Sequence, residues 1–130
     1  TLIQSARSFI YTTALPPAIA CATRASLRLL QDEDWRREKL TCLISQFRRG
    51  ASELGYTLST SVTPIQPVII GDASRAMRLS ASLREAGFYI PAIRPPTVPE
   101  GTARLRITFS ANHCDTDIER LLTALDEHTP

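Results

Sequence analysis

Apolar residues recur at helical spacing in several stretches of the chain, and the longest of these stretches lies before Gly55. Its apolar positions fall at offsets 0, 3, 4, 7, 11 and 14, which places them on one face of a helix. They are Leu40, Leu43, Ile44, Phe47, Ala51 and Leu54. We expect this helix to begin near the acidic segment 32–34, because the positive end of the helix dipole favours anions, and to end at Gly55.

Three further helices are predicted. One spans about 16–30, since proline is tolerated in the first turn of a helix. Another is capped by Asp72 or Ser74 and ends at Gly87, and the last spans 115–125. Their predicted inward faces consist of Ala76, Leu79, Leu83 and Ala86 in the second of these helices and of Ile118, Leu121, Leu122 and Leu125 in the last.

Three short stretches rich in β-branched and aromatic residues are predicted to be strands: 64–71, 88–93 and 104–109. The lead-in at 2–10 is expected to be helical or extended. This order of elements implies an α+β fold in which helices pack against a small three-stranded antiparallel sheet. A chain of 130 residues can bury one core, so we expect a single domain over 1–130.

Composition narrows the function classes. Fifteen basic and thirteen acidic residues leave a net charge of only +2, without interleaved aromatic residues, which disfavours a nucleic-acid-binding module. No apolar run approaches the roughly 20 residues that cross a bilayer, so no membrane association is expected. The widely spaced Cys21, Cys42 and Cys114 are typical of reduced thiols in a cytosolic protein. We expect Cys21 and Cys42 to fill core positions.

The strand at 104–109 has one polar and one apolar face, because successive side chains point to opposite sides. Arg104, Arg106 and Thr108 share the polar face. Pattern alone favours a solvated surface, whereas the functional alternative is an arginine fork that binds a carboxylate or phosphate. The preceding elbow, "RPPTVPEG", holds Thr97 in an extended path and serves either as a rigid linker or as a binding edge.

Two other groups of polar residues are candidates for chemistry. Thr12 and Thr13 stand just ahead of a predicted helix, where hydroxyls can complete a phosphate site, although ordinary helix capping is favoured on sequence alone. His113 and Cys114 are adjacent, and the other histidine, His128, lies near the chain end. We expect neither a metal site nor a Cys/His nucleophilic pair, and interpret these residues as a cap of the last helix.

Several segments together resemble a known family: "FIYTTALPPA", "PIQPVIIGD", "AIRPPTVPEGTARLRITFSANH" and the closing "DIERLLTAL". They look like the C-terminal part of the α-oxoamine synthases, pyridoxal-phosphate-dependent enzymes of fold type I. The long "AIRPPTVPEGTARLR" is similar to the 8-amino-7-oxononanoate synthases of biotin biosynthesis in particular. The resemblance runs from about Leu2 to Leu125.

The resemblance implies a cytoplasmic, homodimeric transferase that condenses L-alanine with a pimeloyl thioester and releases carbon dioxide. Whether the thiol is coenzyme A or a carrier protein stays open. The catalytic lysine is expected upstream, because Lys39, the one lysine in the chain, stands where the family does not use it for catalysis. This chain would be the small C-terminal domain, with residues 1–31 joining a large domain. Alone it is expected to bind no cofactor and to be inactive.

The resemblance also implies roles for five residues. Arg106 matches the ligand of the amino-acid carboxylate, and Thr97 matches a position that contacts substrate. Arg94 is a weaker candidate for recognition of the acyl substrate. Thr12 and Thr13 match hydroxyls that reach the phosphate of pyridoxal 5'-phosphate in the neighbouring subunit. No catalytic residue and no metal ligand is assigned within the chain.

Two points stay open. Asn112 and Cys114 depart from the residues usual in the family, which bears on the cap of the last helix, and Arg104 is interpreted as structural. The alternative to the enzyme is a stand-alone, non-catalytic domain that regulates or assembles with a partner. As part of a longer enzyme, the chain is expected to expose apolar surface and self-associate, notably around Ile3 and the Phe9–Ile10 pair.

Overall fold

The computed structural model describes residues 2–10 and 13–128. The chain divides into two compact units, Thr1–Asp34 and Trp35–Pro130. The assignment of both units to one C-terminal domain, with residues 1–31 joining a preceding large domain, stays a prediction. Within the described ranges, no helix is both long enough and apolar enough to span a bilayer.

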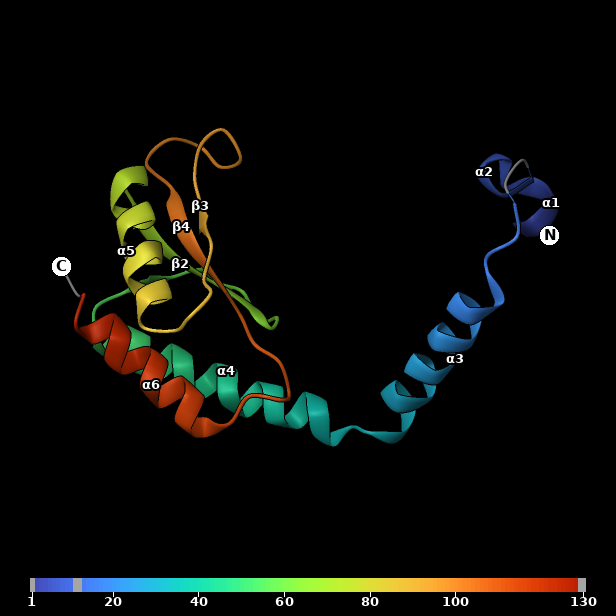
Figure 1. Cartoon of the computed structure of the whole chain (residues 1–130), viewed down its shortest axis with the longest axis horizontal. Coiled ribbons are helices and arrows are strands. Elements are labelled where there is room, and N and C mark those ends of the chain that lie inside the picture. Colours follow the sequence, from blue (N-terminus) through green and yellow to red (C-terminus); the bar gives the residue numbers. More distant parts are fainter. Residues whose placement is uncertain (1, 11–12, 129–130) are drawn as a thin grey trace. The chain divides into compact units, whose positions relative to one another are not determined.

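The first unit consists of three helices, α1 (Leu2–Ser5), α2 (Arg7–Ile10) and α3 (Pro17–Asp32) (Figure 1). Helix α3 continues to Asp32, two residues beyond its predicted end, because neither glycine nor proline interrupts it there. The acidic segment was predicted to open the following helix, and this is wrong for Asp32, which closes α3 instead.

None of the α3 residues is buried within this unit. Its exposed large apolar side chains are Ile19, Leu27, Leu29 and Leu30. Ile10 of α2 is also 46% exposed, as the sequence led us to expect, whereas the side chains of Ile3 and Phe9 lie outside the described residues.

The second unit alternates helices and strands. In chain order its elements are α4 (Trp35–Glu53), β1 (Thr57–Leu58), β2 (Ile65–Gly71), α5 (Ala73–Glu85), β3 (Ala92–Ile93), β4 (Ala103–Thr108) and α6 (Asp115–Asp126). Asp72 caps α5 by accepting a hydrogen bond of 2.7 Å from the amide of Arg75, as one of the two predicted caps would. The elements confirm the expected α+β class.

The strands form one antiparallel sheet in the order β1-β2-β4-β3. It has a fourth strand that the sequence did not predict, the two-residue β1, which pairs Thr57 with Ile69. The strand predicted at 88–93 is shorter than expected and comprises β3 alone. Pro91 precedes β3 and has no amide hydrogen to donate to a ladder, which fits a late start of the strand.

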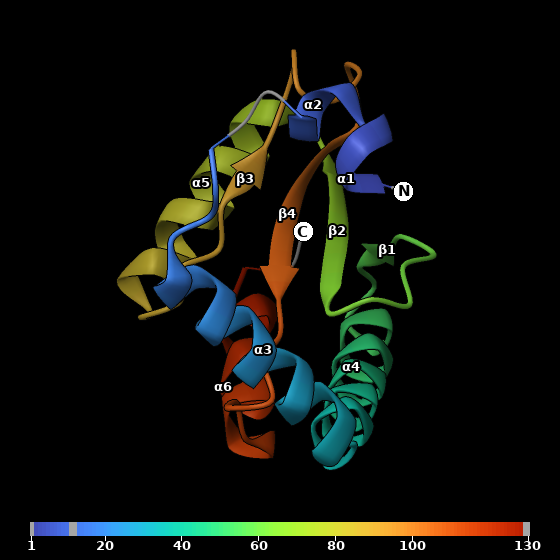
Figure 2. The same ribbon diagram turned by 90° about the vertical axis from the view of Figure 1, so that its right-hand side faces the viewer.

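Helix α5 lies against one face of the sheet, and α4 and α6 pack side by side below it (Figures 1 and 2). The predicted apolar stripe of α4 supplies much of the core, since Leu43, Phe47 and Ala51 are fully buried. From the other elements the core receives Val68, Leu79, Leu83, Leu105, Ile107, Ile118, Leu121 and Leu125. The expectation that cysteines fill the core is wrong, because Cys21 and Cys42 are both exposed. Cys42 lies beside the apolar stripe and not on it.

Two close contacts join α4 to other elements of this unit. Gly50 of α4 faces Leu122 of α6 so closely that a β-carbon at position 50 would overlap the Leu122 side chain. The amide of Gln66 on β2 is buried, and its Oε1 accepts a hydrogen bond of 2.7 Å from the guanidinium group of Arg48. The Gln66 amide nitrogen in turn donates to the carbonyl oxygens of Ser61 and Thr63, which ties the loop before β2 to α4.

Candidate functional site

Strand β4 presents the two arginines as predicted. Ala103, Leu105 and Ile107 are buried on one face, while Arg106 and Thr108 are exposed on the other. The two-residue period of a strand thus separates core from polar face, and the predicted alternation is confirmed.

The two arginines of this strand differ in their surroundings. Arg104 is half-buried, and its Nε donates a hydrogen bond of 3.0 Å to the carbonyl oxygen of Thr102, which fits its structural interpretation. The side chain of Arg106 is exposed, and no carboxylate among the described residues pairs with it. The guanidinium group of Arg106 therefore offers a planar set of donors, two of which can bind two oxygens of one carboxylate or phosphate at once.

The elbow between β3 and β4 is held by its own backbone. The amide of Thr97 donates a hydrogen bond of 3.1 Å to the carbonyl oxygen of Arg94, and the Thr102 amide donates one of 3.2 Å to Pro99. The Thr102 hydroxyl donates to the same Pro99 oxygen at 2.7 Å. Arg94 and Thr97 lie in one turn with exposed side chains, so the structure brings these two candidates together.

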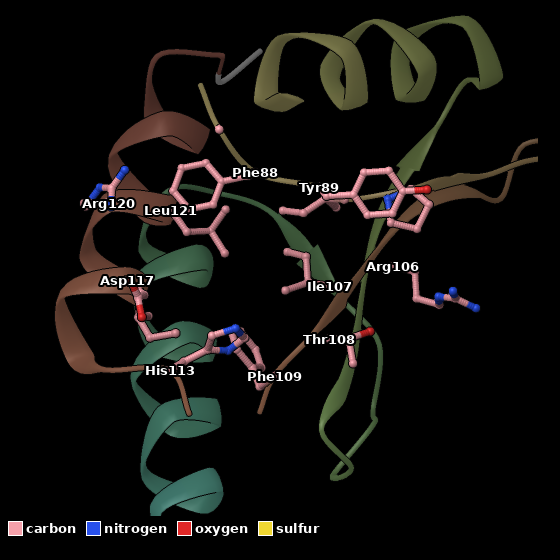
Figure 3. Close-up of a pocket in the computed structure, with 14 residues that line it drawn as sticks. Phe88, Tyr89, Arg106, Ile107, Thr108, Phe109, His113, Asp117, Arg120 and Leu121 are labelled. Atoms are coloured by element: carbon pink, nitrogen blue, oxygen red, sulfur yellow. The ribbon is translucent and has the colours of Figure 1, made fainter. Parts of the chain in front are cut away.

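A cavity of about 500 Å³ lies beside β4, and Arg106 is part of its lining (Figure 3). Its other walls come from the segment that follows α5, where Phe88 lies, and from α6, which contributes Leu121 and Arg120. Arg94 and Thr97 do not line it. Sequence analysis missed this cavity, because its residues come from three separate parts of the chain and no local motif marks them.

Thr12 lies outside the described residues, and Thr13 is exposed in the first unit. The cap of α3 is Pro16, with no side-chain hydrogen bond, so the favoured capping interpretation is wrong for Thr13. The helix start is also a poor source of amide donors. Pro16 and Pro17 have no amide hydrogen, and the amides of Ile19 and Ala20 both donate to the Pro16 oxygen, at 3.0 and 3.3 Å. A phosphate here would depend on hydroxyl groups.

The residues before α6 form a cap, as predicted. Cys114 is the N-cap, and its amide donates a hydrogen bond of 2.9 Å to the Asp117 carboxylate. This bond, followed by that of the Cys114 thiol, lowers the pKa of Asp117 below its usual value. Nδ1 of His113 accepts a hydrogen bond from the Ser110 amide at 3.1 Å. No three potential metal ligands cluster in the part of the chain that the structure describes.

Lys39 has a structural role in this fold. Its Nζ donates a hydrogen bond of 2.8 Å to the carbonyl oxygen of Ala111, which joins the first turns of α4 to the turn before α6.

The described residues can supply only a minor part of a binding site for pyridoxal 5'-phosphate. The exposed hydroxyl of Thr13 can donate to a phosphate oxygen, whereas the amides at the start of α3 are used within the helix or missing. The chain's one lysine, Lys39, donates to the carbonyl oxygen of Ala111.

Comparison with known proteins places this geometry in a family. The chain matches aminotransferase class I and II over residues 1–125. It is 62% identical over 130 residues to the 8-amino-7-oxononanoate synthase of Pseudomonas syringae pv. tomato, a match that covers 100% of this chain and 33% of that protein. The chain spans about a third of the length of the curated relatives it matches.

Two solved structures are similar in fold. The crystal structure of 8-amino-7-oxononanoate synthase from Francisella tularensis gives a TM-score of 0.81 at 31% identity, covering 97% of this chain and 37% of that one. A serine palmitoyltransferase from S. paucimobilis with a bound PLP–myriocin aldimine gives 0.84 at 28% identity, covering 94% of this chain and 31% of that one. The chain belongs to the class I and II aminotransferase family, and it resembles the C-terminal part of 8-amino-7-oxononanoate synthases.

Proposed function

We propose that this chain is the C-terminal part of a pyridoxal-phosphate-dependent 8-amino-7-oxononanoate synthase. The support is identity of about 60% over the whole chain to synthases of that name, from several bacteria. Since the chain spans about a third of those proteins, the remaining two thirds would supply the catalytic lysine and most of the cofactor's contacts. The complete enzyme would act as a cytoplasmic homodimer.

The proposed reaction joins the α-carbon of L-alanine to the acyl carbon of a pimeloyl thioester. The new carbon–carbon bond forms as the carbon–sulfur bond breaks and releases the thiol. The α-proton that alanine loses balances the proton that the released thiol takes up. The alanine carboxylate leaves as carbon dioxide, and a proton from solvent takes its place on the α-carbon. Pyridoxal 5'-phosphate, when bound, supplies an electron sink for the negative charge that develops on the α-carbon.

The structural observation that carries the proposal is the guanidinium group of Arg106 on the exposed face of β4, which pairs with no carboxylate of the described residues. A planar fork of donors holds a carboxylate in a defined orientation, which a single ammonium group would not do. In the proposed enzyme Arg106 binds the alanine carboxylate, so the α-carbon keeps a fixed position during the reaction. Arg104, bonded to Thr102, supports the strand and does not contact substrate.

The elbow residues would add further substrate contacts. The exposed hydroxyl of Thr97 would donate to a substrate oxygen, and Arg94, in the same turn, would contact the acyl substrate or its carrier. Thr13, with its neighbour Thr12, would donate hydroxyl hydrogen bonds to the phosphate of the cofactor. The chain alone, without the remaining two thirds, is expected to be inactive.

The test is product formation by the full-length protein that carries this chain. The purified protein is loaded with pyridoxal 5'-phosphate and given pimeloyl-coenzyme A with L-alanine, glycine or L-serine in separate reactions. Mass spectrometry detects the product, and carbon dioxide release is measured in parallel. Alanine is expected to be the preferred amino acid, with 8-amino-7-oxononanoate as the product. Preference for serine, the amino acid in the name of the structural relative, or no turnover with any of the three, would overturn the proposal.

A further inference from the structure

The cavity beside β4 has the size and lining of a small-molecule site. Its volume of about 500 Å³ falls within the roughly 300–1,000 Å³ typical of ligand pockets. Phe88, Ile107 and Leu121 form its apolar middle, each from a different segment of the chain (Figure 3). Ile107 and Leu121 are almost fully buried, so this wall is fixed by the core.

Positive charge lies at both ends of this apolar wall. Figure 3 shows Arg106 at one end and Arg120 at the opposite end, with Phe88, Leu121 and Ile107 between them. The guanidinium carbon of Arg120 lies 5.8 Å from the centre of the Phe88 ring. This contact brings its charge to the edge of the apolar wall while the group stays exposed.

The Asp117 carboxylate, which lines the same cavity, does not neutralise Arg120. Asp117 is attracted to Arg120, one turn later on α6, yet no ion pair joins Arg120 to a carboxylate of the described residues. The Asp117 carboxylate instead accepts the hydrogen bonds of the Cys114 amide and thiol, at 2.9 and 3.2 Å. The guanidinium group of Arg120 thus keeps its donors available for a ligand.

An apolar trough with an available guanidinium group at the Arg120 end suits a linear aliphatic chain that ends in a negative group. The chain covers apolar surface, and its terminal anion binds Arg120 without being buried. Arg106, at the other end, stays available for the carboxylate of a second ligand.

We propose that this cavity binds the acyl chain of the second substrate and that Arg120 binds its terminal carboxylate. The inference rests on the proposed function, because the name 8-amino-7-oxononanoate describes a chain whose carboxylate is separated from the oxo carbon by five methylene groups. Arg106, at the other end, faces the reacting end of the substrates. Arg120 would therefore select acyl donors that end in a carboxylate over those that end in a methyl group.

The test measures direct binding, without turnover, to the full-length protein labelled at isoleucine and leucine methyl groups. Pimeloyl-coenzyme A and heptanoyl-coenzyme A are titrated separately in the absence of alanine, since they share a chain length and differ by the terminal carboxylate. Pimeloyl-coenzyme A is expected to shift the methyl signals of Ile107 and Leu121. Heptanoyl-coenzyme A is expected to bind at least about five-fold more weakly, the effect of one partly exposed charge-assisted contact.

Three variants identify the group that reads the carboxylate. Arg120→Ala is expected to weaken pimeloyl-coenzyme A binding about five-fold and to leave heptanoyl-coenzyme A binding unchanged, and Arg120→Glu to weaken pimeloyl-coenzyme A binding further. Arg78→Ala removes an exposed arginine of α5 that does not line the cavity, and it should change neither ligand. Equal effects of Arg120→Ala and Arg78→Ala, equal binding of the two ligands, or unshifted Ile107 and Leu121 signals would overturn the inference.

A kinetic readout separates the inference from the proposed function. In the synthase assay Arg120→Ala should raise KM for the pimeloyl thioester about five-fold and leave KM for alanine unchanged. A protein that binds pimeloyl-coenzyme A through Arg120 but makes no 8-amino-7-oxononanoate would refute the proposed function and leave the cavity's ligand class standing. A working synthase in which Arg120→Ala changes neither KM nor pimeloyl-coenzyme A binding would refute the inference alone.

Discussion

The backbone amide of Arg106 donates a hydrogen bond to the carbonyl oxygen of Pro91, with 3.0 Å between nitrogen and oxygen. This bond fixes the segment before the elbow onto β4, and the pairs Ala92–Leu105 and Ile93–Arg104 continue the same register. The start of the elbow is thus set relative to Arg106 by backbone contacts. Exposed side chains of the elbow are free to serve binding.

Thr97→Val should impair activity and spare stability. The Thr97 side chain is exposed, and only its amide makes a local hydrogen bond, to Arg94. Valine keeps the shape of the side chain and removes the hydroxyl. The kcat/KM of the full-length enzyme should therefore fall about ten-fold, the effect of losing one hydrogen bond to a charged substrate oxygen. The free energy of unfolding should change by less than about 0.5 kcal/mol.

Thr102→Val is the matched control for Thr97. Its hydroxyl donates to Pro99, so this variant should lose about 1 kcal/mol of stability while kcat/KM of the folded enzyme stays within about two-fold. Denaturant unfolding and steady-state kinetics measure the two quantities. The assigned roles would be wrong if the two variants exchanged these effects.

Gly50 lies in the close packing of α4 against α6. A β-carbon there would overlap the side chain of Leu122, so Gly50→Ala should destabilise the fold by about 1–2 kcal/mol despite alanine's better helix propensity. In a Leu122→Ala background the overlap disappears. The same Gly50→Ala change should then stabilise by up to about 1 kcal/mol. A double-mutant cycle in urea tests this reversal of sign, and additive effects would contradict the close contact.

Two neighbouring arginines of α4, Arg48 and Arg49, should differ in their contribution to stability, because Arg48 bonds to the buried amide of Gln66. Arg48 donates to Gln66 Oε1 and to the carbonyl oxygens of Ser59 and Ser61, whereas Arg49 is exposed. Arg48→Met leaves the Gln66 oxygen without this donor and should lower the free energy of unfolding by about 1–3 kcal/mol. Arg49→Met should change it by less than about 0.5 kcal/mol. Similar values for the two variants, in parallel unfolding curves, would show that the Arg48 contacts contribute little.

The cap of α6 should weaken in acid. The hydrogen bonds from Cys114 lower the pKa of Asp117 in the folded protein below its ordinary value of 3.8. A carboxyl with a lowered pKa stabilises the fold above its unfolded pKa, and this stabilisation is lost as the pH falls through the folded pKa. The contribution should be complete at about pH 5 and reduced at about pH 3.

Asp117→Asn tests this dependence, with Asp126→Asn, near the other end of α6, as the control for loss of a carboxylate. Urea unfolding of each variant is compared with the unsubstituted protein at both pH values. The stability difference caused by Asp117→Asn should shrink on acidification. A difference that stays constant, or one matched by Asp126→Asn, would contradict the role of the Asp117 charge in the cap.

Local patterns predicted the helices and the faces of β4 well, because each depends on periodicity within one element. The stripe from Leu43 to Ala51 is buried, and Leu105 and Ile107 separate from Arg106 as the strand period requires. The errors arise where local signals are weak. β1 has two residues, and its pairing with β2 depends on tertiary contact.

Sequence analysis identified only those residues of the candidate site to which the family resemblance assigns a role. Arg106 and Thr97 stand in a stretch that carries the family resemblance, so sequence alone identified them. Arg120 stands in the closing "DIERLLTAL", but the resemblance assigned no role to it or to Phe88. The two residues come together only when α6 packs beside the segment that follows α5. The exposure of Cys42 could have been anticipated, because it lies off the apolar stripe of its helix.

The most direct test of the proposed function compares Arg106→Ala with Arg104→Ala in the full-length enzyme. The two arginines are two residues apart on one face of β4, but the side chain of Arg104 donates to the carbonyl oxygen of Thr102, just before the strand, whereas that of Arg106 is exposed. Arg106→Ala should lower kcat/KM for alanine by about a hundred-fold or more, the effect of a lost bidentate contact to a carboxylate, and Arg104→Ala by less than about five-fold. Equal losses in both variants, or a normal kcat/KM for alanine in Arg106→Ala, would contradict a carboxylate-binding role for Arg106.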